Sequence, residues 1–533
     1  FKFDFDTVAL LIADTTKTYS NTTAGDYIRT RAEGFAYEVA ASGASDHHVT
    51  TGGGLKLYVL PIDQGYYVSA FWNGAGDPTT AIQLAADTAR DANAKLIGIH
   101  GTYAVTDTIV LECDGDLSQM IIEADGAAVS PVVRFGTVSG TPTSYRKMML
   151  PRARNSTRVS GEWGEGVGVE LANCNTCSLF VPSATEFEVG LDCGGYNSGF
   201  AYNTVELGFI YSNKINKRIS PKGATGWANQ NTFIGGRFGF NTGDFTTSGY
   251  VGTRQVVIAK GSTLNGGPNN NIYLNSSIES DLVEYMIEFN ESANYNQFIN
   301  CRYEGTANNV LFTTGTASGL TDNVFIGGYQ VTQIDFTFSG AGTSRYNQVI
   351  GARSSDIEAS GYAFNISNVS GGAEANPHIQ GFNAGDNPML KDASSTDWVY
   401  RIYANGISGK RSTDAYAQAF LDFQNGRLYF GAGAAPATTY FGRVGTSLQV
   451  NARFLPDADS TRDFGSSTLR WANGYITQVR PGAGAVIWTS GTGTPEAAVT
   501  APIGSLFTRT DGGAATTLYV KESGAGNTGW VAK

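Results

Sequence analysis

The sequence contains few of the residues from which many functional sites are built. Five cysteines and four histidines occur among its 533 residues. An odd and sparse set of cysteines excludes a fold that is held together by disulfides. The histidines stand at positions 47, 48, 100 and 378, outside the central repeats described below. A serine or cysteine nucleophile in those repeats would have no histidine as its base, which excludes the common hydrolase triads.

Positive charge is also scarce. Lysine and arginine number 36 against 47 aspartate and glutamate residues, which gives a net charge of −11. The basic residues are scattered, so no patch suited to nucleic acid is visible. No apolar run approaches the roughly 20 residues that span a bilayer, and no strand–GxxxxGK–helix unit offers a phosphate loop. We therefore expect neither nucleic acid as a partner nor a membrane span. Because residue 1 is phenylalanine, we expect the numbering to begin inside a longer natural chain.

What the sequence does contain is a repeat. A 41% hydrophobic content, with 26 tyrosines and 29 phenylalanines, is ample for a core. A short pattern recurs along the middle of the chain. It consists of an asparagine and a spacer, followed by an aromatic or β-branched residue, usually an aliphatic residue, and then small residues. The recurring asparagines are Asn203, Asn231, Asn271, Asn296, Asn323 and Asn347. Their steps of 28, 40, 25, 27 and 24 residues are typical of a solenoid, whose units are too small to fold without stacking on their neighbours.

The residue pattern within each repeat indicates strands. Glycine, asparagine, threonine and serine are abundant, and apolar residues alternate with polar ones at a period of two. We expect a right-handed parallel β-helix in which each asparagine occupies a corner, tolerates a left-handed φ and hydrogen-bonds its own backbone. The residues three positions after the asparagines are expected to form one internal stack. This stack comprises Ile234, Leu274, Ile299, Ile326 and Ile350.

The rest of the chain divides around this region. A segment with a helix pattern starts near Thr79 or Thr80, either of which we expect as its N-cap, and runs directly into strand–turn–strand. Such a helix would cover the open end of a solenoid. We expect an all-β protein with an N-terminal capping helix and C-terminal antiparallel β domains. The predicted units are an entry segment (1–72), the parallel β-helix (73–372), an antiparallel β domain (388–480) and a small β module (481–533).

Several motifs resemble those of bacteriophage tailspikes. The run from Gly74-Ala75-Gly76-Asp77 through Ala81-Ile82-Gln83 to Gly101-Thr102-Tyr103 resembles the opening of pectate-lyase-like β-helices, although Pro78 replaces a glycine and Thr79-Thr80 replace an aspartate pair. The segment from Asp14 to Tyr37 is similar to a tailspike entry segment. Asp463-Phe464-Gly465 to Trp471, and the stretch from Thr510-Asp511-Gly512-Gly513 to Trp530, are similar to C-terminal modules of tail fibres and tailspikes.

The resemblance implies a tailspike depolymerase. Such a protein would be a homotrimer, attached to the phage tail through a preceding N-terminal region and located extracellularly on the virion. It would bind and cleave a bacterial surface polysaccharide, either lipopolysaccharide O-antigen or capsule, within the chain. Hydrolysis is favoured over β-elimination. The alternatives are an adhesin that holds glycan without cutting it, and a secreted polysaccharide lyase.

Counting along the repeats gives candidate catalytic residues. Eight residues after two successive repeat asparagines stand Glu279 and Glu304, on the face expected to point outward. Stacked at about 4.8 Å, two carboxylates oppose each other's ionisation, and one tends to hold a proton. A carboxyl pair of this kind is what the cleavage of a glycosidic bond requires. Asp281 continues the same face. Alternatively, these residues are a solvated face with ion pairs between coils.

Neighbouring positions predict a substrate-binding surface. Arg302, and the equivalent Arg237 and Arg353, would form an arginine column that grips acidic sugars or keeps a nucleophile ionised. Tyr329 occupies the same offset and would stack on a sugar ring. Trp227 lies in a turn-like insertion and would line a groove. Because an acidic protein is repelled by an anionic capsule, we expect a substrate that is either neutral or recognised by the arginine column.

No metal or other cofactor is expected. Cys174-Asn-Thr-Cys177 has the spacing of half a zinc site, but neither a second pair nor a histidine pair completes it. The cysteines are therefore predicted to be small buried residues inside the coils. A calcium-assisted lyase would need clustered aspartates on adjacent coils. No such cluster is visible, and Asp281 and Asp322 are the residues that come nearest to one.

Overall fold

The computed structural model describes most of the first 330 residues, shorter stretches after them, and the C-terminus. The described residues are 1–126, 129–159, 161–162, 164–240, 251–261, 267–279, 283–304, 310–314, 320–330, 334–340, 344–354, 364–367, 376–382, 388–391, 398–403, 406–411, 419–422, 427–430, 439–444, 447–450, 486–524 and 526–533. The chain separates into two compact units, residues 1–452 and 453–533.

The first unit begins with a small mixed sheet and two helices. The sheet comprises β1 (Phe3–Phe5), β2 (Tyr27–Thr30), β3 (Ala36–Val39), β5 (Lys56–Val59) and β4 (Val49–Thr50), in that order. The helices are α1 (Val8–Ala13) and α2 (Thr79–Asp91), with a 3-10 turn at Val68–Ala70. The predicted capping helix is thus present. Its N-cap is Pro78, not a threonine, and Asp77 Oδ1 accepts the N–H of Thr79 at 2.9 Å instead.

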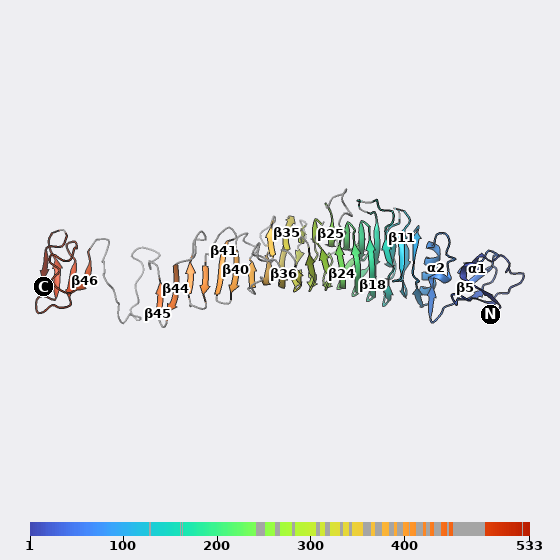
Figure 1. Ribbon diagram of the computed structural model, residues 1–533, viewed down its shortest axis with the longest axis horizontal. Coiled ribbons are helices and arrows are strands. Elements are labelled where there is room, and N and C mark those ends of the chain that lie inside the picture. Colours follow the sequence, from blue (N-terminus) through green and yellow to red (C-terminus); the bar gives the residue numbers. More distant parts are fainter. Residues whose placement is uncertain are drawn as a thin grey trace. The chain divides into compact units, whose positions relative to one another are not determined.

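A long sheet of stacked parallel strands follows the helix (Figure 1). Its parallel strands are β6 (Gly65–Tyr67), β7 (Lys95–Ile97), β8 (Gly101–Val105), β10 (Asp114–Asp116), β11 (Met120–Ala124), β14 (Lys147–Met149), β15 (Arg152–Arg154), β18 (Ser178–Thr185), β21 (Thr204–Tyr211), β24 (Thr232–Gly239), β26 (Ile272–Leu274), β27 (Ser277–Glu279), β29 (Gln297–Ile299), β30 (Arg302–Glu304), β32 (Leu320–Thr321), β33 (Val324–Ile326), β34 (Tyr329–Gln330), β36 (Ser344–Ser354) and β38 (Asn376–Phe382). We call this the long sheet.

Two further parallel sheets complete each coil. The second sheet comprises β9 (Ile109–Leu111), β12 (Val133–Gly136), β16 (Val167–Ala172), β19 (Val189–Gly194), β22 (Ile215–Ile219), β25 (Arg254–Ala259), β28 (Tyr285–Asn290), β31 (Val310–Thr314), β35 (Ile334–Gly340) and β37 (Phe364–Ser367). The third comprises β13 (Thr143–Ser144), β17 (Cys174–Asn175), β20 (Gly199–Ala201) and β23 (Trp227–Asn229). Each coil adds a strand parallel to the strand before it, so the predicted parallel β-helix is confirmed.

Antiparallel strands follow the parallel ones. They are β39 (Pro388–Lys391), β40 (Trp398–Tyr403), β41 (Gly406–Arg411), β42 (Ala419–Asp422), β43 (Arg427–Phe430), β44 (Thr439–Val444) and β45 (Ser447–Val450). The second unit contains β46 (Trp488–Gly491), β47 (Leu506–Arg509), β48 (Leu518–Lys521) and β49 (Trp530–Ala532) around a small core of Ile487, Ala501, Phe507, Tyr519 and Trp530. The predicted domain boundaries stay a prediction.

The recurring asparagines form a buried ladder that runs from coil to coil. The Nδ2 atom of each donates to Oδ1 of the next at 2.9 to 3.1 Å, from Asn203 to Asn347. The backbone N–H of each donates to the same Oδ1 at 3.0 to 3.2 Å. A buried amide must find such partners because an unpaired one is costly. Cys177 ends the ladder, its N–H bonded to Oδ1 of Asn203 at 2.9 Å.

The ladder corrects the predicted corner. The left-handed residue is not the asparagine but the residue before it, as at Tyr202, Gln230 and Tyr295, with φ of 57 to 58°. A second left-handed residue follows four positions after the asparagine, as at Gly235, Asn275, Asn300 and Gly327. The copies that follow Asn271, Asn296 and Asn323 therefore contain two short strands separated by a kink, whereas β24 continues through Gly235.

The kink also overturns part of the predicted side-chain register. The aromatic residues Phe233, Tyr273, Phe298 and Phe325 are buried and stack ring on ring, with centroids 4.4 to 5.1 Å apart. The column from Ile234 to Ile350 exists, but Ile234, Leu274, Ile299 and Ile326 are half-buried and lie outside this stack. Because the larger aromatic side chains bury more apolar area, the strand turns them inward. Beyond the kink the prediction is confirmed: Ile278, Cys301 and Tyr303 are buried.

A lysine is enclosed in the same core. Lys217 is fully buried, and its Nζ lies 2.7 Å from Tyr273 Oη and 3.6 Å from the centre of the Phe233 ring. Burial without a carboxylate contact disfavours the charged form, which lowers the pKa of Lys217 to about 8.

All five cysteines are buried as predicted.

The ladder predicts a large effect from one interior substitution. Asn296→Ala removes Oδ1, which accepts hydrogen bonds from the side chain and the backbone N–H of Asn271. It also removes Nδ2, which donates to Oδ1 of Asn323. Since buried partners are left unsatisfied, we expect a loss of about 2–4 kcal/mol in the free energy of unfolding, measured in denaturant. Gln297→Ala, on the half-exposed neighbouring position, is the control and should change it by about 0.5 kcal/mol or less. Equal losses in the two variants would contradict a stabilising ladder.

The buried lysine predicts a pH dependence. Between about pH 10.5 and pH 8 the unfolded chain binds a proton at position 217 that the folded chain does not. The free energy of unfolding should therefore fall by about 3 kcal/mol as the pH is lowered through this window, and stay level below it. Lys217→Met should lack this component. The measurement is the difference in unfolding free energy between the two proteins from pH 7 to 10.5; a constant difference would show that the lysine is charged in the folded state.

Candidate functional site

The two predicted glutamates lie side by side on the long sheet. Glu279 is the last residue of β27 and Glu304 the last residue of β30, and they are register partners across the parallel pair. The residues before them, Ile278 and Tyr303, are buried, so both glutamates point away from the core. This arrangement places two carboxyl groups on neighbouring coils, as the repeat count predicts.

Glu279 is held from one side by an arginine and a tyrosine. Arg237, at the end of β24, donates from Nε to Oε1 at 2.6 Å and from Nη2 to Oε2 at 3.3 Å. Tyr211 Oη lies 3.3 Å from Oε2. Gly239 makes room for the carboxylate, because a Cβ there would overlap both Oε2 and the Tyr211 ring. The hydrogen bond to Glu279 raises the pKa of the Arg237 guanidinium. The result is a fixed carboxylate whose side chain is only 14% exposed.

Glu304 is held differently. Arg302 precedes it by two residues on the same strand, and Nη2 lies 2.6 Å from Oε2. The Glu304 side chain is 36% exposed, more than twice the exposed fraction of Glu279. Each carboxylate thus forms an ion pair with its own arginine. The two groups are distinct: one is enclosed and doubly held, the other is accessible.

A single row of the long sheet contains most of the predicted binding residues. Register pairs align Phe209, Arg237, Ser277, Arg302, Tyr329 and Arg353 on successive coils. Arg237 and Arg302 are about half exposed, as is Tyr329. The guanidinium of Arg237 lies 5.8 Å from the Phe209 ring centre and 5.2 Å from that of Tyr211. We call this line of residues the arginine row. Asp281 and the side chain of Arg353 lie outside the described residues.

Trp227 is not part of this row. It lies on β23 of the third sheet, half-buried, and its ring packs against Gly199, where a Cβ would overlap it. Its role is therefore to cover the neighbouring coil. The structure brings Glu279, Glu304, Arg237, Arg302 and Tyr329 together on one face, and leaves Trp227 elsewhere.

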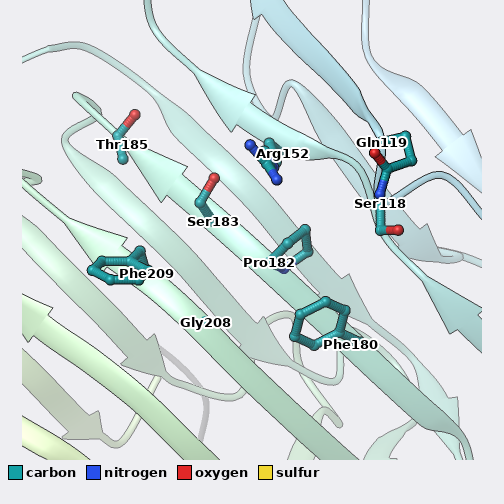
Figure 2. A pocket seen from close by; sticks show the side chains of 9 residues that line it. All are labelled: Ser118, Gln119, Arg152, Phe180, Pro182, Ser183, Thr185, Gly208 and Phe209. Atoms are coloured by element: carbon teal, nitrogen blue, oxygen red, sulfur yellow. The ribbon is translucent and has the colours of Figure 1, made fainter. Parts of the chain in front are cut away.

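The row continues into a groove that the sequence did not reveal. The groove has a volume of about 690 Å³ and lies over β15, β18 and β21. Figure 2 shows Arg152, Ser183 and Phe209 in succession on these three strands, with Phe180 and Pro182 beside them. Ser183 is the register partner of Phe209, which also belongs to the arginine row. Two of these strands, β15 and β18, precede the first repeat asparagine, Asn203, so counting from the repeat could not locate the groove.

A second cluster of charged residues lies on the second sheet. Glu170 and Asp192, nearly fully buried, share Lys222 at 2.5 and 2.8 Å. Arg134 pairs with Glu170 at 2.6 Å and Arg218 with Asp192 at 2.6 Å. Although burial raises the pKa of each carboxyl group, Lys222 and the arginines outweigh burial and lower it. These carboxylates are fully paired and closed to a polymer, which is the arrangement of a stabilising network.

Among the described residues, no group of three or more histidine, cysteine, aspartate or glutamate side chains is placed to hold a metal ion. No helix in this part of the chain is long and apolar enough to cross a bilayer.

Comparison with known proteins gives only distant likenesses. No protein-family model and no curated protein sequence matches the chain. Full-length tailspike protein 2 of an Escherichia coli O157:H7 bacteriophage is similar at 11% identity and a TM-score of 0.47; the match covers 72% of this chain and 52% of that one. The chain thus spans about half the length of that tailspike.

Two other solved structures are similar. One is tailspike protein gp49 of Acinetobacter baumannii bacteriophage Fri1, described as a capsular polysaccharide depolymerase, at 10% identity and a TM-score of 0.30, covering 76% of this chain and 81% of that one. The other is PfbA, a surface adhesin of Streptococcus pneumoniae, at 12% identity and a TM-score of 0.40, covering 66% and 99%. At these low values, the assignment of a parallel β-helix rests on the pairing of the chain's own strands.

Proposed function

We propose that the chain is a phage tailspike that binds a bacterial surface polysaccharide and cleaves glycosidic bonds within it, by hydrolysis. The observation that carries this proposal is the pair Glu279 and Glu304 on adjacent coils, each beside an arginine. A groove with aromatic residues lies on earlier coils of the same sheet. Carboxyl pairs of this kind cleave glycosidic bonds. The sequence motifs that resemble tailspikes support the same conclusion.

The two glutamates have different roles in this proposal. Glu279 is enclosed and bonded to Arg237 and Tyr211, which hold it in place, and it acts as nucleophile or base. Glu304 is more accessible and acts as the proton donor to the leaving sugar oxygen, once substrate displaces Arg302 from it. Arg302 and Tyr329 then contact the bound sugars through hydrogen bonds and ring stacking. Asp281 and Arg353 stay predicted members of the site.

One observation favours a second candidate, an adhesin. Both carboxylates are engaged in ion pairs, and exposed ion pairs on a sheet are commonly no more than a solvated face. In an adhesin the same arginine row would hold glycan without cutting it. Cleavage therefore has to be measured separately from binding.

Substitution of the pair separates the two candidates. Glu279→Gln and Glu304→Gln keep size and hydrogen bonding but remove the titrating group, so turnover should fall by about 10²- to 10⁴-fold while the fold is retained. Arg302→Ala should mainly weaken binding. Glu206→Gln, an exposed glutamate on β21 away from the row, is the matched control and should keep wild-type turnover.

The assay incubates each protein with purified bacterial polysaccharides and follows new reducing ends together with the ultraviolet absorbance of unsaturated sugars. Reducing ends without absorbance indicate hydrolysis, and both together indicate elimination. Wild-type turnover in both glutamine variants would show that the pair is only a solvated face. Binding without any cleavage by the wild-type protein would favour the adhesin.

The assembly that accompanies this function is a homotrimer located on the virion tail. The half-buried aliphatic column of Ile234, Leu274, Ile299 and Ile326 runs along the outer side of the long sheet, and a neighbouring copy would cover it. Light scattering of the chain at micromolar concentration should give three times the mass of one chain. A monomer mass under these conditions would contradict the trimer.

A further inference from the structure

Arg152 differs from the other outward arginines of the long sheet that the structure describes. Arg154, two residues later on β15, pairs with Glu123, while Arg237 and Arg302 pair with Glu279 and Glu304. Arg152 is exposed, and among the described residues no side chain forms an ion pair or hydrogen bond with it. Among the described residues that line the groove, it is the charged one. In an acidic protein, an arginine left without a partner in a concave site is available for an anionic ligand.

The surroundings of Arg152 suit a sugar rather than a small ion alone. Phe209 is 55% exposed, and with Phe180 it offers apolar ring faces on which sugar rings can stack. Ser183 and Thr185 add hydroxyl groups on the same strand. The volume of about 690 Å³ lies within the range of roughly 300–1,000 Å³ that ligand sites usually have. The fork of a guanidinium group matches the two oxygens of a carboxylate.

Register connects the groove with the proposed cleavage site. Ala153 pairs with Ala184, which aligns Arg152 with Ser183, and the row then passes through Phe209 and Arg237 to the strand that ends in Glu279. Four steps of about 4.8 Å separate Arg152 from that strand, a distance of about 19 Å. A glycan that follows the row would therefore reach both places at once, with several sugar units between them.

We propose that the groove is a recognition subsite for a carboxylate-bearing sugar, which Arg152 binds while the glycosidic bond to be cleaved lies beside Glu279 and Glu304. The substrate is then an acidic polysaccharide whose carboxylated sugar recurs along the chain. This inference rests on the proposed binding of a bacterial polysaccharide, and it adds the class of sugar and the residue that selects it.

The test measures binding of the full chain to immobilised bacterial polysaccharides of known composition, some with uronic acids and some neutral. Wild type should bind a uronic-acid polysaccharide in preference to the neutral ones. Arg152→Gln should weaken that binding by about 10- to 100-fold, because the loss of a hydrogen bond to a charged group usually lowers affinity by about this factor. Arg154→Gln, with its side chain outside the groove on the same strand, is the matched control and should bind like wild type.

A chemically matched substrate completes the test. Reduction of the carboxyl groups of the bound polysaccharide to alcohols keeps the chain but removes the charge. Wild type should bind the reduced polysaccharide as weakly as Arg152→Gln binds the native one, and Arg152→Gln should not distinguish the two. Binding that survives reduction, binding to neutral polysaccharides only, or no binding to any of them would overturn the proposal, as would equal affinities of wild type and Arg152→Gln.

These outcomes are distinguishable from failure of the proposed cleavage. If Arg152→Gln loses affinity while Glu279→Gln and Glu304→Gln cleave at the wild-type rate, the subsite stands and the catalytic pair is wrong. If the glutamine variants lose turnover but Arg152→Gln binds and cleaves like wild type, the catalytic pair stands and the subsite is wrong. Thermal unfolding of each variant excludes loss of the fold, which is not expected for an exposed arginine.

Discussion

The asparagine ladder is the interaction on which the rest of this structure depends. Each ladder side chain is buried, and its bond along the ladder forms only if the next coil presents its own asparagine at the same height. Because a buried amide without partners is costly, the ladder fixes how successive coils stack. Every strand of the long sheet from β21 to β36 that follows a ladder residue is then held in register with its neighbours.

The register of the coils determines which side chains lie together on the surface of the repeat. Once the coils are aligned, residues at the same offset meet in a row about 4.8 Å apart, whatever their chemical type. Inside, this alignment stacks the rings of Tyr273 and Phe298 at 4.4 Å. Outside, it brings Glu279 beside Glu304 and places Arg237 within reach of Glu279. The core and the arginine row therefore follow from the same constraint, and the row can vary in sequence without affecting the core.

The sequence predicted much of this arrangement because its information is periodic. The repeat identified the fold, and the count of eight residues found the register pair Glu279 and Glu304. It misplaced Ile299 and Phe298, because the left-handed residue at Asn300 shifts the alternation. The asparagine or glycine that recurs at this position is the residue type that favours such a kink, and it was not included in the count. Arg152 could not be found by counting, since its coil precedes the first ladder residue. The ion pairs of the glutamates depend on side-chain direction, which periodicity does not encode.

The most direct test of this account is a crystal structure of the Glu279→Gln variant with an oligosaccharide cut from a polysaccharide that the protein binds. The account predicts sugar rings along the arginine row, with a glycosidic oxygen next to Glu304 and with sugar units continuing over Phe209 toward Arg152. Oligosaccharide bound on the second sheet near Glu170 and Asp192, or anywhere away from the long sheet, would contradict it.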